Sequence, residues 1–102
     1  MQANKPQWGG FVAGAGSLWV SDIGQDVVWR VDLQRGTRVA KIPLGGEPAG
    51  VAVGAGAVWI ADTNGAILKV DPRTNDIVAR IPAKGVLNGL AFGFGRLWIA
   101  FD

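Results

Sequence analysis

A unit of about forty residues recurs along the chain, and this repeat restricts the possible folds more than any other feature of the sequence. The segment GGFVAGAGSLWVSD at 9–22 returns as AGVAVGAGAVWIAD at 49–62 and as NGLAFGFGRLWIAF at 88–101. Each copy carries one tryptophan, and these are spaced forty and thirty-nine residues apart: Trp19, Trp59 and Trp98. A chain of this kind folds as similar units in series, each of which covers a face of its neighbour.

The second half of the unit also recurs, but only twice. The sequence VVWRVDLQRGTRVAKIP at 27–43 matches AILKVDPRTNDIVARIP at 66–82, and no third copy follows. Val, Ile, Leu and Trp, which favour strands, dominate these segments, and no helical period extends beyond a turn. The second unit therefore predicts four short strands, at Gly50–Val53, Ala57–Asp62, Ala66–Asp71 and Asp76–Pro82.

Turn residues separate the predicted strands. Gly54, Ala55 and Gly56 predict a tight hairpin, because glycine adopts positive φ at little cost. The sequence PRTN at 72–75 suits a type I turn. Four antiparallel strands in a repeat of this length are typical of a propeller blade, so the predicted fold is an all-β segment of a β-propeller.

We expect about two and a half blades from a repeat of this length. Residues 1–8 lead into a first blade at 9–48, a second blade follows at 49–87, and a half blade with only its two inner strands occupies 88–102. We expect the three repeated tryptophans to lie between blades, with the outermost copies facing water. Because so few blades leave apolar flanks uncovered, we expect homo-oligomerisation to complete the ring, and we favour a homodimer over a monomer.

The sequence AVWIADTNGAILKVDPRTNDIVARIPAKG at 57–85 resembles the repeats of YVTN-type bacterial β-propellers and of streptogramin-lyase-like propellers. The resemblance extends over 9–102 and implies a propeller scaffold. It also implies a parent family that is often exported to the periplasm or the extracellular space, although residues 1–8 lack the apolar core of a secretory signal. Streptogramin lyases are understood to use a histidine base and a magnesium site, and this chain has no histidine for that role.

Composition argues against several classes of function. The chain has no cysteine and no histidine, which removes thiolate chemistry, the commonest general base and the usual zinc ligand. A net charge of +2 without a basic run argues against nucleic-acid binding. No apolar run approaches the roughly 20 residues of a membrane span. We therefore expect no enzyme, no cofactor, and neither nucleic acid nor membrane as a partner.

Acidic residues gather in the segments that join the second strand to the third and one unit to the next: Asp22, Asp26, Glu47 and Asp62. In a propeller these segments surround one mouth of the central channel, where Asn64 and Asn88 also fall. Only Lys84 opposes them there, and the other basic residues of the repeats lie on the third and fourth strands or at the opposite turns. An acidic mouth repeated around a ring would attract a small cationic ligand or a metal ion.

The same residues also allow a purely structural interpretation. Asp22 and Asp62 each end a strand before a turn, where an aspartate often accepts hydrogen bonds from the backbone of the next residues. Under this interpretation the two carboxylates close their turns and bind no ligand.

The sequence thus favours a non-enzymatic scaffold or binding module that assembles into a closed ring with an acidic channel mouth. One alternative is a fragment of a streptogramin-lyase-like enzyme. Another is a natural or engineered propeller fragment that has no function of its own.

Overall fold

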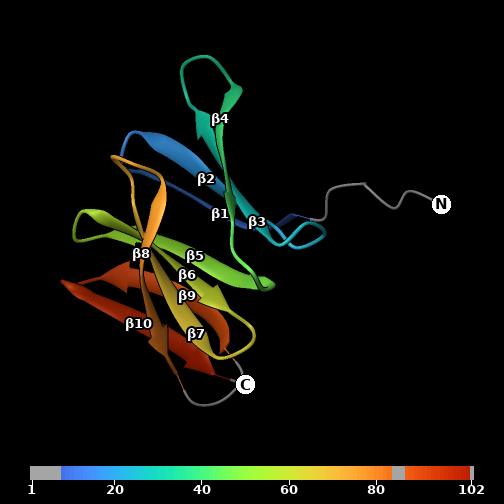
Figure 1. Cartoon of the computed structure of the whole chain (residues 1–102). Coiled ribbons are helices and arrows are strands. Elements are labelled where there is room, and N and C mark those ends of the chain that lie inside the picture. The colour runs from blue at the N-terminus through green and yellow to red at the C-terminus, as the bar shows by residue number, and fades with distance from the viewer. Residues whose placement is uncertain (1–7, 84–86, 102) are drawn as a thin grey trace.

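The computed structural model describes residues 8–83 and 87–101, which form three antiparallel sheets (Figure 1). The first sheet holds β1 to β4 in order: Trp8–Gly14, Ser17–Asp22, Val27–Asp32 and Thr37–Pro43. The second sheet holds β5 to β8: Pro48–Gly54, Ala57–Asp62, Ala66–Asp71 and Asp76–Pro82. The third sheet holds β9 and β10: Leu87–Gly93 and Arg96–Phe101. This part of the chain contains no helix long and apolar enough to cross a membrane.

The predicted strands of the second unit are confirmed, three of them with the same bounds, as β6, β7 and β8. Strand β5 is longer than predicted, because it already begins at Pro48. Pro48 pairs with Asp62 across an irregularity at Ala49, and proline is tolerated as the first residue of a strand, where no donor is needed. The lead-in segment predicted at 1–8 lies outside the described residues, except for the backbone of Trp8.

The hairpins between the first two strands of each sheet turn through two residues with positive φ: Ala15 with Gly16, Ala55 with Gly56, and Phe94 with Gly95. Positive φ at both positions gives a type I′ turn, whose twist matches that of the paired strands. The sequence therefore predicted the correct turn and its Gly56, but it wrongly included Gly54. Gly54 belongs to strand β5, where it pairs with Ala57, and the turn begins at Ala55.

The two four-stranded sheets have a bulge at the same position of their outer strand. The register of β3 with β4 shifts at Val39, and the register of β7 with β8 shifts at the equivalent Val78. Both valines are 54% exposed. A bulge twists an edge strand away from regular pairing, so these outer edges are poorly suited to adding a strand from another chain.

The sheets stack in chain order, with the second sheet between the first and the third (Figure 1). The inner strands make the contacts: β1 and β2 lie against β5, and β5 and β6 lie against β9. The apolar cluster between the first two sheets consists of Trp19, Val28, Ile42, Leu44, Val51, Val58, Ile60, Leu68 and Val70. Removal of this apolar surface from water stabilises the stack.

The exposure of the three repeated tryptophans shows how far the next sheet covers each of them. Trp19, between the first and second sheets, has no exposed surface. Trp59 is half-buried against the smaller cluster that contains Ala61 and Leu87, and Trp98 is 53% exposed on the far side of β10. The prediction that the outermost copies face water is confirmed for Trp98 but wrong for Trp19, because the second sheet covers the Trp19 side of the first.

Candidate functional site

The turns after β2 and β6 and the connections between sheets lie along one edge of the stack, here called the loop edge. Three backbone hydrogen bonds join them: Leu44 N–H to Asp26 O (3.0 Å), Thr63 N–H to Glu47 O (2.9 Å) and Ala83 N–H to Gly65 O (2.8 Å). The prediction that these segments meet at one edge is confirmed. The acidic residues that they carry therefore share one side of the molecule.

Asp22 lies at the end of β2 with no exposed surface. One carboxylate oxygen accepts a hydrogen bond from the Gly24 backbone at 3.0 Å, and the other accepts from the Gln25 amide at 2.9 Å and the Trp29 indole at 3.2 Å. The bond to the backbone two residues ahead is the Asx arrangement that fixes a turn. Asp22 thus closes the β2–β3 turn and orients Trp29.

Asp62 occupies the equivalent position in the second sheet and is 2% exposed. It accepts a hydrogen bond from the Asn64 backbone at 2.9 Å, and the Arg80 guanidinium lies 3.5 Å from its second oxygen. Arg80 also donates to the Leu44 carbonyl at 3.1 Å, in the connection that precedes β5. The turn, the outer strand β8 and the inter-sheet connection are therefore joined around one carboxylate.

The remaining predicted ligands differ in their exposure. Asp26, Glu47 and Asn64 are exposed, whereas the side chain of Asn88 lies outside the described residues. Within 8–83 and 87–101, no group of three or more aspartate, glutamate, histidine or cysteine side chains is arranged to hold a metal ion. Binding of a small cation at the loop edge stays a prediction, and it depends on Asp26 and Glu47, since Asp22 and Asp62 already bind groups of the protein.

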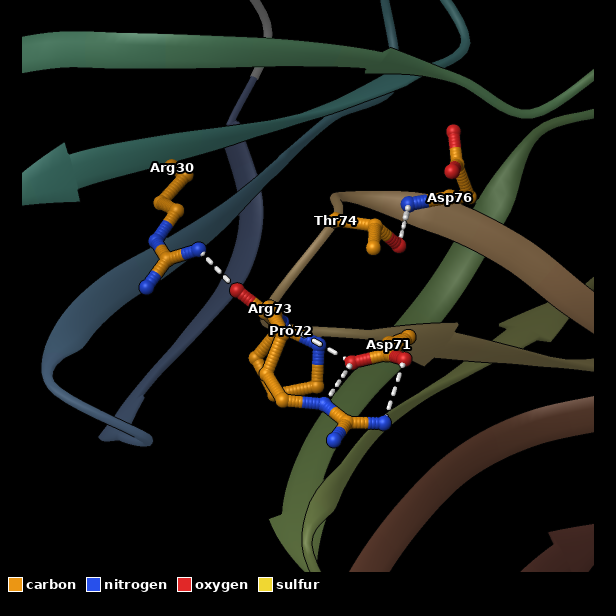
Figure 2. A network of polar contacts seen from close by, with 6 residues as sticks. All are labelled: Arg30, Asp71, Pro72, Arg73, Thr74 and Asp76. Carbon is orange, nitrogen blue, oxygen red and sulfur yellow. Dashed lines mark hydrogen bonds and ion pairs between the residues drawn. The ribbon is translucent and has the colours of Figure 1, made fainter.

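A second polar network joins the first two sheets at the opposite edge (Figure 2). The Arg30 side chain extends from β3 to the β7–β8 turn, where it donates to the Pro72 carbonyl and to Asn75 Oδ1 at 2.7 Å. Its Nε donates to Ser17 Oγ at 2.8 Å, and its guanidinium lies 4.6 Å from the centre of the Trp19 ring. A planar guanidinium can make these contacts together, whereas a single ammonium nitrogen cannot.

The β7–β8 turn that receives Arg30 is closed by Asp71. Asp71 Oδ1 accepts from the Arg73 backbone at 2.9 Å, and Oδ2 lies 3.2 Å from the Arg73 guanidinium. The hydrogen bonds and the charge of Arg73 hold the pKa of the Asp71 carboxyl below its ordinary value. Because the folded-state pKa is depressed, the small stabilisation that this pair contributes is present near neutral pH and is lost as the pH falls through the folded-state pKa.

Arg30 is predicted to position the first two sheets relative to each other. Replacement by lysine (Arg30→Lys) keeps the charge but removes the simultaneous bonds to Ser17 and the β7–β8 turn, which we expect to lower the free energy of unfolding by about 1 kcal/mol. Urea unfolding at a fixed protein concentration measures this change. Arg38→Lys is the matched control, since Arg38 is exposed, and a loss as large in the control would contradict the role of Arg30.

Sequence reasoning missed both bridging arginines, and one of them had a detectable signal. In the observed ladder Arg80 faces Leu68 and Asp62 faces Ala66, which puts Arg80 and Asp62 on the same face of the sheet. Pairing the predicted strands would have found this proximity. The contact of Arg30 with Pro72 depends on the relative placement of two sheets, for which the sequence gives no register.

Comparison with solved structures identifies the architecture. The chain superposes on Kuenenia stuttgartiensis hydrazine synthase with a TM-score of 0.79 and 15% identity, covering 85% of this chain and 26% of that one. For Myxococcus xanthus glutaminyl cyclase the TM-score is 0.77 and the identity 12%, covering 96% and 45%. For the Neurospora crassa Pan2 WD40 domain the values are 0.76 and 12%, covering 91% and 29%.

The chain has a β-propeller-like fold. Its four-stranded antiparallel sheets correspond to blades, and the chain is a partial propeller that spans about a quarter to a half of the length of the proteins it matches. Neither a family model nor a curated protein sequence matches it. The sequence identities are low, and the three matched proteins differ in kind. The structural similarity therefore shows the fold alone.

Proposed function

We propose that this partial propeller is a non-enzymatic scaffold or binding module, which associates through the end faces of its blade stack to complete a ring. The buried carboxylates and the bridging arginines of the described blades have structural roles. Asp22 and Asp62 close turns, while Arg30 and Arg80 join neighbouring blades. The sequence has no histidine, which is the commonest general base, and no cysteine to act as a nucleophile.

Exposure at the two ends of the stack is the observation that carries this proposal. Phe11 on the first blade is 74% exposed, whereas the equivalent Val51 on the second blade is 8% exposed. Trp98 on the last strand is 53% exposed, whereas the equivalent Trp19 is fully buried. Large apolar groups in water are unfavourable, and association that covers them is favoured in proportion to the area removed.

We also propose that the scaffold is of the YVTN type or the streptogramin-lyase-like type. The support for this assignment is the repeat at 57–85, with its turn-closing Asp62 and Asp71. Lyase activity has less support, because the chain has no histidine to act as the base. In a completed ring, Asp26 and Glu47 would border the mouth at the loop edge, and a small cation is the ligand that we propose there.

The mass of the chain in solution tests the scaffold proposal. We expect light scattering to report a multiple of the 10.7 kDa chain mass, with dissociation on dilution. A homodimer is the assembly that we favour. A single species of 10.7 kDa across the micromolar range would contradict association through the end faces.

A further inference from the structure

We propose that the partner is a second copy of this chain, docked head to tail. The tail face, defined as Gly89, Ala91, Trp98 and Ala100 on β9 and β10, would seat on the head face of the next copy, defined as Phe11, Leu18, Val20 and Val31. This inference rests on the proposed function, and it adds which two faces meet and the polarity of the contact. The packing between the blades of one chain provides its template.

The tail face already carries its tryptophan in the packed orientation. The indole N–H of Trp98 donates to the Gly93 carbonyl at 3.1 Å. The equivalent bonds in the earlier blades are Trp19 to Gly14 at 2.9 Å and Trp59 to Gly54 at 3.0 Å. The Trp98 ring is therefore fixed as the buried Trp19 ring is, although it is half in water, and little ordering is needed on docking.

The head face is equivalent to the surface that covers Trp19. Leu18, Val20 and Val31 correspond in the repeat to residues of the second blade that have no exposed surface, namely Val58, Ile60 and Val70. On the first blade the same positions are partly exposed and, with Phe11, line an apolar hollow of about 480 Å³. The head face is thus an uncovered copy of a surface that this chain buries once already.

The two faces also complement each other in shape. The tail face has its own hollow of about 300 Å³ beside Trp98, and Gly89, Ala91 and Ala100 keep it open. Phe11 projects from the head face with 74% of its surface exposed. Head-to-tail docking brings Trp98 toward one hollow and Phe11 toward the other.

The tail face contains the two strands that make most of the contact between neighbouring blades. Inside the chain, neighbouring blades meet through their inner strands: β1 and β2 lie against β5, and β5 and β6 lie against β9. Strands β9 and β10 are the same inner pair in the third unit. The tail face therefore supplies the inner-strand part of such a contact, whereas Val28 and Ile42, which β3 and β4 add to the cluster between the first two blades, have no counterpart in it.

Charge favours this polarity over a head-to-head pair. Trp29 packs beside the head face, and its ring lies 4.7 Å from the Arg38 guanidinium and 5.4 Å from the Lys41 ammonium. Two head faces in contact would bring these cations together, which is unfavourable. The tail face has one cation beside its four members, Arg96 on β10, so a head-to-tail contact brings fewer cations together than a head-to-head contact. A head-to-tail contact is heterologous, and such contacts form a ring where the rotation from one copy to the next closes.

Complementation between two single-face variants tests the polarity. Phe11→Lys blocks the head face and Trp98→Lys blocks the tail face, so each variant alone is expected to be a monomer by light scattering. A mixture contains one intact head face and one intact tail face, and it is expected to form a one-to-one complex with twice the 10.7 kDa chain mass. Circular dichroism confirms that each variant is folded. If Trp98→Lys is not folded, the exposed Ala91→Lys replaces it, because it adds the charge and keeps the indole.

The outcomes separate this inference from the proposed function. A monomeric native chain overturns both, and leaves the end faces to another occupant. A native chain that associates, with either variant associating to the same mass, overturns the head-to-tail polarity only. A mixture that stays monomeric also overturns the polarity, since its two intact faces would then not match.

Discussion

Replacement of Trp19 by alanine is expected to lower the free energy of unfolding by about 3–5 kcal/mol, the largest effect of any single substitution considered for this chain. Trp19 is fully buried in the cluster between the first two blades, to which the second blade contributes Val51 and Val58. Its removal leaves a cavity between two sheets that Arg30 still holds together at Pro72 and Asn75. Since the sheets cannot close the space fully, the loss includes a cavity contribution besides the lost burial.

Trp98→Ala is the matched control, because the residue, the strand and the indole hydrogen bond are equivalent and only the covering blade differs. Because 53% of the Trp98 surface is exposed, we expect Trp98→Ala to lower the free energy of unfolding by about 1 kcal/mol or less. Both variants are compared by urea unfolding at a concentration where the native chain is dissociated, so that assembly does not contribute. Equal losses in the two variants would contradict the stacking of blades around Trp19.

The repeat made most of the fold predictable. Strand bounds such as Ala57–Asp62 followed from hydrophobic patterning between turn residues, and the exposure of Trp98 followed from stacking in series, whereas Trp19 was also expected to face water and is buried. The hairpins were less predictable. Alanine at positive φ is uncommon, so the glycines on either side of Ala55 pointed to a turn one residue too early. Local rules thus located each turn but not its register.

The candidate site was predictable only in part. Its place along one edge followed from the topology, and Asp22 and Asp62 bind the backbone of their turns as the structural interpretation expected. The sequence did not predict the arginine contacts that join neighbouring blades. The bonds of Arg30 to Pro72 and of Arg80 to Leu44 connect residues far apart in sequence, across two sheets whose relative placement no short motif encodes.

The glycine that ends β5 is expected to show the second large effect. A methyl group at Gly54 would lie 2.1 Å from Phe92 Cδ1, because β5 and β9 pack closely at this point. Gly54→Ala must displace the Phe92 ring or separate the blades, so we expect the free energy of unfolding to fall by about 1–3 kcal/mol. Hydrogen exchange should show the earliest loss of protection in β9, the strand that carries the displaced ring.

Gly93→Ala tests whether the loss of stability in Gly54→Ala comes from the neighbouring blade or from the backbone. It occupies the equivalent position at the end of β9, where an added methyl group would meet no atom within 4 Å. Gly93→Ala is therefore expected to leave the stability of the dissociated chain unchanged, or to raise it by up to about 1 kcal/mol through the lower entropy of the unfolded state. A loss in Gly93→Ala equal to that in Gly54→Ala would place the cost in the hairpin itself. If Gly93→Ala instead lowers the free energy of unfolding only at concentrations where the chains associate, a second copy packs against Gly93. Within one chain, Val53 of the second blade packs in the same way against the equivalent Gly14.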